Sequence, residues 1–315
     1  MDARSLGPQR PGDPKLLRRI RAHQSWYRAE VLNLDDWGVT APPHSREYGS
    51  ILTSKAAESG ANFTSVMAAE AYRRRRLTGW GVEPYRCERY LTSSQTLTLN
   101  LFAPLAVDLD WLNRVLDSLD LAGVGRPEWL EIEYQPRFLR AGRRDRTLAD
   151  AFIKTASTGI VIETKLADQF SRRWSTVVGS SFYEQVNAEF SLWNSSQMEF
   201  DTPARDQLGR VHALGALAAT SSPPIIMIHH PLDESGAKNA QRYRELLQEP
   251  SLLKILDLEH FIRTMMDAAR SDAQRNIAEQ LLLRYVAHEL SDDAFSILEE
   301  TRLGRAVGPR MEPTT

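Results

Sequence analysis

The stretch that decides the fold runs from Leu148 to Lys165 and reads LADAFIKTASTGIVIETK. Its first part, Leu148–Ile153, has the apolar character of a strand, and Ile160–Ile162 opens a second strand with β-branched residues. Ser157–Gly159, which lies between them, is typical of a tight turn. We therefore predict an antiparallel hairpin over this stretch.

Three charged side chains stand out in the hairpin: Asp150, Glu163 and Lys165. Residues two apart in a strand project from the same face, so Glu163 and Lys165 point together and Thr164 points away. If the hairpin pairs as predicted, Asp150 brings its carboxylate to the same place. Charges at the end of a buried strand are costly unless they are paired or bind an ion. The alternative is an ordinary solvated strand face, on which Glu and Lys are common.

The combination of two carboxylates and a lysine predicts metal-assisted phosphodiester hydrolysis. Adjacent carboxylates bind a hard divalent cation, and Mg²⁺ or Mn²⁺ suits oxygen ligands. Such an ion polarises a phosphoryl oxygen and lowers the pKa of a bound water. A lysine adds a compact positive charge that orients water or stabilises the charge on the phosphate. We predict that Asp150 and Glu163 hold the metal and that Lys165 is catalytic.

A further carboxylate is expected from the preceding strand. Trp129–Tyr134 alternates apolar and polar residues, as a half-buried strand does. Glu131 and Glu133 share one face of it, so either could complete the site. We favour Glu133 as catalytic residue and metal ligand because it lies nearer the arginine-rich loop 137–146, but the choice stays open.

Two polar groups are candidates for nucleic-acid contacts. The loop 137–146 joins two strands of the predicted site, and arginine forms bidentate bonds with phosphate; we predict such contacts for Arg143, Arg144 and Arg146. On a helix predicted over 203–219, Gln207 and Arg210 are three residues apart and share a face. They are expected to contact nucleic acid or to orient the lysine. The alternatives are a solvated loop and an exposed helix face.

Composition limits the remaining possibilities. The 315 residues carry a formal net charge of -2, so attraction to nucleic acid must come from a local patch. Residues 1–90 contain 15 Lys and Arg against 10 Asp and Glu, which makes this region basic. The single cysteine, Cys87, excludes an internal disulfide and a cysteine-based zinc site. No apolar run approaches the roughly 20 residues of a membrane span, and the N-terminus lacks a signal-peptide pattern. We expect a soluble, cytoplasmic protein.

The pattern along the chain predicts five regions. They are a disordered N-terminus (1–13), a basic helical region (14–90), the catalytic core (91–235), a helical C-terminal region (236–303) and a disordered tail (304–315). Within the core we expect helices near 95–105, 106–119, 182–193 and 203–219 and a buried strand at 224–228. In the C-terminal region we expect only helices, over 236–248, 251–269 and 272–298.

The order of these elements resembles the common core of the PD-(D/E)XK nuclease superfamily, which has the restriction-endonuclease-like fold. The longer run from Ser94 to Lys165 resembles a bacterial branch of predicted nucleases, and the resemblance covers about 45–230. It implies an α/β protein with a mixed sheet flanked by helices and with helical extensions at both ends. It also implies metal ligands at Asp150 and Glu163 and a catalytic lysine at Lys165. Ala149 replaces the proline of the family motif.

Many members of that superfamily carry an additional Glu in the first core helix. Residues 95–105 contain none, so Glu131 or Glu133 would substitute for it. The resulting prediction is a Mg²⁺-dependent deoxyribonuclease acting on DNA in defence or DNA repair. One alternative is an inactive nucleic-acid-binding module, marked by a Glu163–Lys165 salt bridge that closes the site. Another is a protein-interaction subunit or homodimer assembled through the helices of 251–298.

Overall fold

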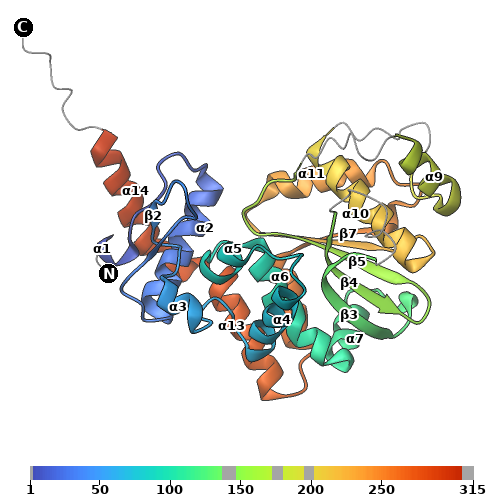
Figure 1. Ribbon diagram of the computed structural model, residues 1–315, viewed down its shortest axis with the longest axis horizontal. Helices are drawn as coiled ribbons and strands as arrows, with labels where there is room; N and C mark the ends of the chain where they lie inside the picture. Colours follow the sequence, from blue (N-terminus) through green and yellow to red (C-terminus); the bar gives the residue numbers. More distant parts are fainter. Residues whose placement is uncertain (1–2, 137–146, 172–179, 195–201, 307–315) are drawn as a thin grey trace, which may run out of the picture. The chain divides into compact units, whose positions relative to one another are not determined.

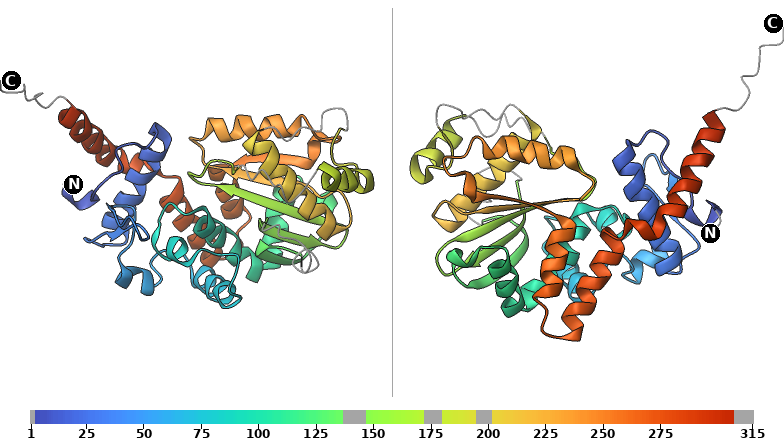
Figure 2. Two further views of the ribbon diagram at one scale, coloured as in Figure 1. Left: turned by 45° about the horizontal axis from the view of Figure 1, so that its top comes forward. Right: turned by 180° about the vertical axis from the view of Figure 1, so that it is seen from behind.

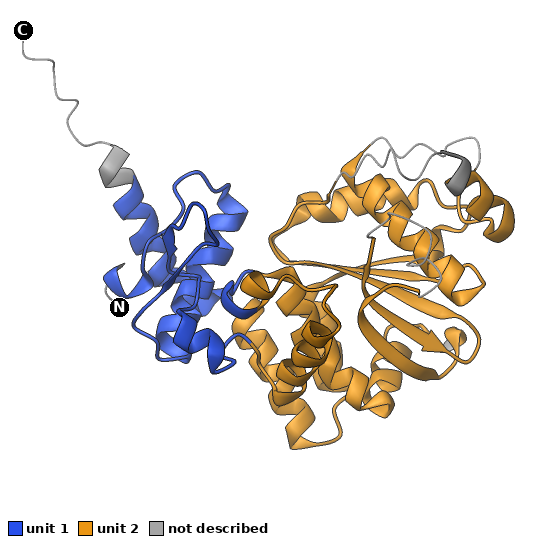
Figure 3. Cartoon of the chain, in the orientation of Figure 1, with its two compact units in different colours: residues 1–62, 88–92, 287–315 blue, residues 63–87, 93–286 orange. Residues whose placement is uncertain are grey.

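The computed structural model describes residues 3–136, 147–171, 180–194 and 202–306. The chain divides into two compact units (Figure 3). Unit 1 comprises residues 1–62, 88–92 and 287–315, and unit 2 comprises 63–87 and 93–286. The boundaries expected at 90 and 235 therefore do not coincide with these units, because elements outside 91–235 pack into unit 2.

Unit 2 is built on a mixed five-stranded sheet with the order β3-β4-β5-β6-β7 (Figure 1). The strands are β3 (Pro127–Tyr134), β4 (Ala149–Thr155), β5 (Gly159–Lys165), β6 (Ile225–His229) and β7 (Leu253–Asp257). The pairs β3–β4 and β4–β5 are antiparallel, whereas the pairs β5–β6 and β6–β7 are parallel. The predicted hairpin is thus confirmed as β4 and β5.

Helices cover both faces of this sheet (Figures 1 and 2). One face carries α10 (Pro203–Ala219) and α11 (Glu234–Arg244), and the other carries α6 (Ser94–Val107), α7 (Leu109–Ser118) and α12 (Leu258–Asp267). Every residue of β5 and β6 is buried, as expected of central strands covered on both sides. The further elements of unit 2 are α4 (Val66–Leu77), α5 (Pro84–Arg89, which ends in unit 1), η2 (Ala122–Val124), α9 (Ser180–Phe190), η4 (Pro250–Leu252) and α13 (Asp272–Tyr285).

Helix α10 is the element that positions side chains over β5. The Thr202 side chain caps its first turn by accepting a hydrogen bond from the N–H of Arg205, and Pro203 occupies the first turn. A Cβ at Gly215 would lie 2.1 Å from Cγ2 of Val161, so only glycine allows this close approach to the strand. The helix therefore packs directly on β5 along its length.

The fifth strand corrects the expectation of a wholly helical C-terminal region. Leu253–Asp257 was predicted to be helical within 251–269, but it forms β7 and pairs in parallel with β6. Pro250 interrupts any helix before it, and the Asp257 side chain caps α12, which begins only at Leu258. The prediction was wrong because the backbone groups of β7 are satisfied by β6, a partner distant in sequence.

Unit 1 is mainly helical and combines segments from both ends of the sequence. Its elements are α1 (Ala3–Leu6), α2 (Lys15–Trp26), the π-helical η1 (Tyr27–Val31), β1 (Gly38–Val39), β2 (Glu47–Tyr48), α3 (Ser54–Glu58), η5 (His288–Ser291) and α14 (Asp292–Ala306). A small core gathers Leu52, Ala56 and Leu91. The expectation of disorder over 1–13 is wrong for the described residues, because Leu6 is fully buried. Helix α14 extends to Ala306, past residue 304, where the tail was expected to begin.

The arginines of α2 are engaged inside unit 1. Arg18 forms two hydrogen bonds with the Glu299 carboxylate, at 2.9 and 3.1 Å. Arg21 Nε donates to Asp13 at 2.5 Å. Arg19 pairs with Asp292 at the start of α14. The positive charge of this helix is therefore neutralised by acidic partners within unit 1.

Candidate metal-dependent nuclease site

The β4–β5 hairpin brings the two predicted carboxylates together. Its register pairs Ala151 with Ile162, and one further step places Asp150 opposite Glu163. Oδ2 of Asp150 accepts hydrogen bonds from the backbone N–H of Thr164 at 2.7 Å and from its hydroxyl at 2.9 Å. These two bonds fix the position of the aspartate beside the end of β5.

Glu163 and Lys165 project together from β5, as predicted, and form a buried pair. Lys165 Nζ lies 2.8 Å from Glu163 Oε1, and their side chains are 8% and 1% exposed. Gln207 of α10 bridges them, since its Nε2 donates to Glu163 Oε1 at 2.5 Å and its Oε1 accepts from Lys165 at 3.3 Å. The Gln207 amide therefore holds the carboxylate and the ammonium in one arrangement.

The structure distinguishes the two candidate glutamates of β3. Glu133 is 3% exposed and has a positive φ of 54°, which interrupts the strand alternation on which the shared face was predicted. Its Oε1 accepts a hydrogen bond from Gln95 Nε2 at 2.9 Å. Glu131 instead pairs with Arg75 at 3.2 Å, and its side chain is 45% exposed. Glu133 is therefore the glutamate that joins the buried carboxylates.

Burial and mutual repulsion dominate the electrostatics of this cluster. Burial and the carboxylate of Glu163 raise the pKa of Asp150 to about 7. Burial, followed by the charge of Asp150, holds the pKa of Glu133 well above its ordinary value. Burial alone would lower the pKa of Lys165, but the carboxylates of Glu163 and Asp150 raise it above its usual range. Lys165 is thus a cation at neutral pH, and the buried carboxyl groups of Asp150 and Glu133 beside it keep their protons to a higher pH than exposed carboxyl groups do.

The donor set fits a hard divalent cation. Glu163 Oε2 is buried and accepts no hydrogen bond from any described residue. A buried carboxylate oxygen without a donor is costly, and a bound cation would remove that cost. In the part of the chain that the structure describes, no three His, Cys, Asp or Glu side chains are arranged to hold an ion among themselves. Mg²⁺ is usually held by one or two carboxylates, with water and phosphate oxygens as its other ligands.

The remaining predicted contacts separate into three cases. Gln207 lies at the site, as described above. Arg210 is 5% exposed and binds within the unit, pairing with Asp206 at 3.2 Å and donating to Thr147 Oγ1 at 2.9 Å and to the Ser171 carbonyl at 3.3 Å. It therefore secures the segments around the site. The predicted phosphate contacts Arg143, Arg144 and Arg146 lie outside the described residues.

Helix α6 contributes two site residues that were not predicted. The first is Gln95, whose Nε2 donates both to Glu133 and to the Gly81 carbonyl, the latter at 2.8 Å. The Thr98 hydroxyl lies 2.6 Å from the hydroxyl of Thr164, which itself donates to Asp150. Both are polar residues in the first part of a helix that is buried from Thr96 to Leu105, and polar side chains in such a helix are the signal by which they could have been found.

Comparison with known proteins agrees with this geometry. A family model described as the PD-(D/E)XK nuclease superfamily matches residues 11–287. Searches of curated proteins and of solved structures give no match. Across the described residues, no helix has both the length and the apolar character needed to cross a bilayer. The mixed five-stranded sheet flanked by helices confirms the predicted α/β, restriction-endonuclease-like fold. Because the match spans most of its length, the chain belongs to the PD-(D/E)XK nuclease superfamily.

Proposed function

We propose that this nuclease is a Mg²⁺- or Mn²⁺-dependent deoxyribonuclease that hydrolyses phosphodiester bonds of DNA. The observation that carries the proposal is the buried Glu163 carboxylate, which has one oxygen bound by Lys165 and Gln207 and the other without a donor among the residues that the structure describes. Asp150 stands opposite it with a raised pKa. Defence or DNA repair is the setting that we propose from the superfamily.

The proposed roles follow from the contacts of each residue. Asp150 and Glu163 would hold the cation, with Glu133 as the adjacent carboxylate; when bound, the ion supplies Lewis-acid stabilisation and acidifies water. Lys165 is protonated, so it acts as a donor that steadies the phosphate or the attacking water and not as a general base. Gln207 holds the side chains of Lys165 and Glu163 in place through a hydrogen bond to each. Arg143, Arg144 and Arg146 are proposed to contact the phosphates.

The test is a cleavage assay on plasmid and on linear single- and double-stranded DNA, with Mg²⁺, with Mn²⁺ and with chelator. Lys165→Ala is compared with Lys154→Ala, a lysine of the same hairpin whose Nζ donates to the Thr158 carbonyl. Metal-dependent cleavage that Lys165→Ala abolishes and Lys154→Ala retains would support the proposal. Absence of both cleavage and metal binding by calorimetry in the wild type would contradict it.

A second candidate function is a nucleic-acid-binding module without catalysis. The observation that favours it is the Lys165–Glu163 ion pair at 2.8 Å, which occupies Oε1 of the glutamate. This candidate predicts DNA binding that is the same with metal and with chelator. Oε2 of Glu163 argues against it, because no residue in the described part of the chain donates to this oxygen and a closed site would have satisfied both oxygens.

The assembly hypothesis receives less support from the C-terminal helices. The buried face of α13 includes Leu281 and Tyr285, and the Tyr285 hydroxyl accepts a hydrogen bond from Asn100 at 2.8 Å within unit 2. Helix α14 packs on α2 within unit 1. These contacts use the apolar and ionic faces of the helices inside the same chain.

A further inference from the structure

A pocket of about 410 Å³ lies beside the edge strand β3 of unit 2. Its lining combines aromatic rings with polar side chains; the lining residues are Arg75, Thr78, Trp80, Trp129, Glu131, Tyr134 and Gln135. This size falls within the range of about 300–1,000 Å³ that is common for small-molecule sites. The mixture of flat rings and hydrogen-bonding groups is suited to a planar, polar heterocycle.

The rings of Trp129 and Tyr134 in this pocket pack against the buried ring of Phe152. Tyr134 stacks on Phe152 with a centroid distance of 4.7 Å and an interplanar angle of 18°. Trp129 lies 5.6 Å from both of these rings, and it is nevertheless 39% exposed. On the other side, the Arg75 guanidinium lies 4.4 Å from the centre of the Trp80 ring. A tryptophan that is held rigidly and still exposed offers a stacking surface at little entropic cost.

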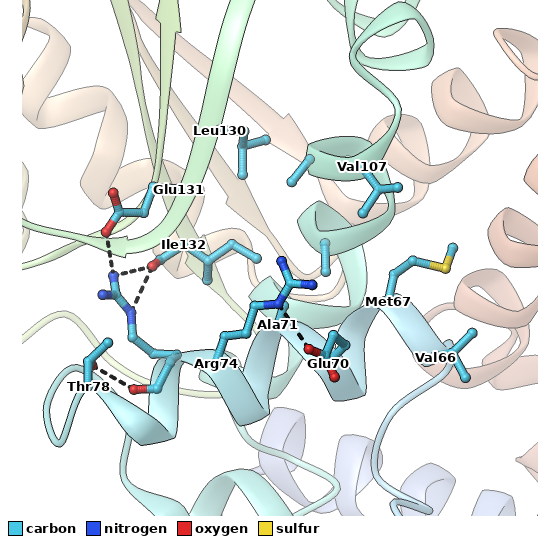
Figure 4. A pocket seen from close by; sticks show the side chains of 13 residues that line it. Val66, Met67, Glu70, Ala71, Arg74, Thr78, Val107, Leu130, Glu131 and Ile132 are labelled. Atoms are coloured by element: carbon cyan, nitrogen blue, oxygen red, sulfur yellow. Dashed lines mark hydrogen bonds and ion pairs between the residues drawn. The ribbon is translucent and has the colours of Figure 1, made fainter.

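Arg75 fixes the polar edge of the pocket. Its Nε donates to the Ile132 carbonyl at 3.1 Å, and its second terminal nitrogen lies 3.2 Å from Glu131 Oε1. Arg75, Thr78 and Glu131 also line a neighbouring pocket of about 590 Å³. Figure 4 shows that second pocket, with Thr78, Glu131 and Ile132 at one end and the apolar Val66, Met67 and Val107 at the other. The aromatic pocket therefore differs from its neighbour in carrying the stacking rings.

The strand register places this aromatic pocket on the catalytic face of the sheet. Glu131 pairs with Phe152, and Phe152 pairs with Val161. Paired residues project from one face, and Glu163 follows Val161 by two positions, so all four share that face. Trp129 precedes Glu133 by four residues, roughly 13 Å along a strand. A nucleic-acid strand following the edge strand β3, on which Trp129 and Glu131 are exposed, would span that distance with a few nucleotides.

We propose that the aromatic pocket binds one unpaired nucleobase, stacked on Trp129, of the strand that the site cleaves. The inference rests on the proposed nuclease function and gives it a substrate class: nucleic acid with at least one base out of the duplex stack. Duplex DNA without such a base would present only its backbone to this face.

The test measures binding in chelator, where no cleavage occurs, with a short single-stranded oligonucleotide and a fully abasic strand of the same length. Trp129→Ala should weaken binding of the oligonucleotide by about 5- to 150-fold, the range of one stacked base, and leave the abasic strand unaffected. Trp129→Phe should restore most of the affinity. Leu77→Ala, which alters an exposed residue of α4 outside both pockets, should change neither.

Equal weakening of both strands by Trp129→Ala, or no weakening of either, would overturn the proposal. A mononucleotide that binds as tightly as the oligonucleotide would overturn the assignment to a strand. Cleavage is scored separately with metal on the same variants. If Lys165-dependent cleavage occurs and the base-dependent effect is absent, the base pocket alone fails; if the effect is present without cleavage, the nuclease proposal fails.

Discussion

Both units bury charged side chains, but they compensate them differently. In unit 1, the fully buried Arg28 donates to the backbone carbonyls of Gly49 and Asp36, at 2.9 and 3.2 Å, and to two others. In unit 2, Glu163 keeps a buried oxygen without a donor among the described residues, and the pKa of Asp150 rises to about 7. Compensated charge stabilises a fold, whereas uncompensated charge marks a place where another molecule or ion binds.

The largest expected effect is on activity and comes from Asp150→Asn. Cleavage should fall by more than about 100-fold, since even outer-shell partners of metal ligands are worth about 10- to 100-fold. In chelator, the free energy of unfolding should rise, because the neutral amide removes the repulsion with Glu163 that raises the pKa of Asp150. Kinetics and urea unfolding check the two effects. If Asp150→Asn were as active as the wild type and less stable, the charge of Asp150 would be compensated within the protein, and the two units would not differ in this respect.

The corresponding change in unit 1 is Arg28→Met, which should act on stability alone. Several carbonyl groups would lose their donor inside the protein, at a cost of roughly 3–5 kcal/mol. Calorimetric binding of Mn²⁺ to unit 2 should be unchanged. Arg10→Met is the matched control, because the Arg10 side chain is 56% exposed. A loss below about 1 kcal/mol for Arg28→Met would show that its bonds contribute little.

His212 tests whether a buried group in unit 2 outside the site is compensated like those of unit 1. Its Nδ1 lies 2.9 Å from the Tyr243 hydroxyl and its Nε2 lies 2.9 Å from the Pro223 carbonyl, which suits a neutral ring. Burial lowers the pKa of His212 to about 4. Between the unfolded value near 6.5 and 4, the unfolded state binds more protons, so stability is lost as the pH falls through this window.

For the wild type, the contribution of His212 should make the free energy of unfolding about 2 kcal/mol lower at about pH 5 than at about pH 8. Urea unfolding at both pH values measures this difference, and in His212→Gln it should shrink by that amount. An unchanged pH dependence in the variant would mean that His212 is not buried in its neutral form. The variant serves as its own control, because only the difference between the two pH values is compared.

The smallest effect is expected at the rim of unit 1, where Arg18 and Glu299 form a partly exposed pair. A double-mutant cycle with alanine should give a coupling of about 1 kcal/mol that decreases with salt. The Arg263–Glu259 pair on α12, with more exposed partners, is a suitable reference. A coupling energy that does not respond to salt would indicate that the Arg18–Glu299 pair is shielded from solvent, as Arg28 is.

The β4–β5 hairpin could be predicted from sequence because its determinants are local. A short turn fixes the register of β4 and β5, and the register alone places Asp150 opposite Glu163. The helix α10 was also predictable, since its cap and proline lie within the first turn. The site therefore follows from a stretch of fewer than twenty residues together with one helix.

The remaining features depend on partners that are distant in sequence. The bond between Gln95 and Glu133 needs the positive φ at Glu133, which no local pattern required of a glutamate. Strand β7 could not be predicted from its own residues, because it forms by pairing with β6. The ion pairs of Arg18 and Arg19 with Glu299 and Asp292 join residues separated by more than 270 positions, so a basic run in the sequence could not reveal that this charge is neutralised.

The division of unit 1 between two distant segments also has a consequence for synthesis. Residues 63–286 leave the ribosome before α14, so the nuclease unit can fold on the nascent chain while unit 1 is still incomplete. Until translation delivers Asp292 and Glu299, Arg19 and Arg18 carry uncompensated positive charge. The emerging polypeptide is thus transiently cationic at α2, and the later synthesis of α14 removes that charge.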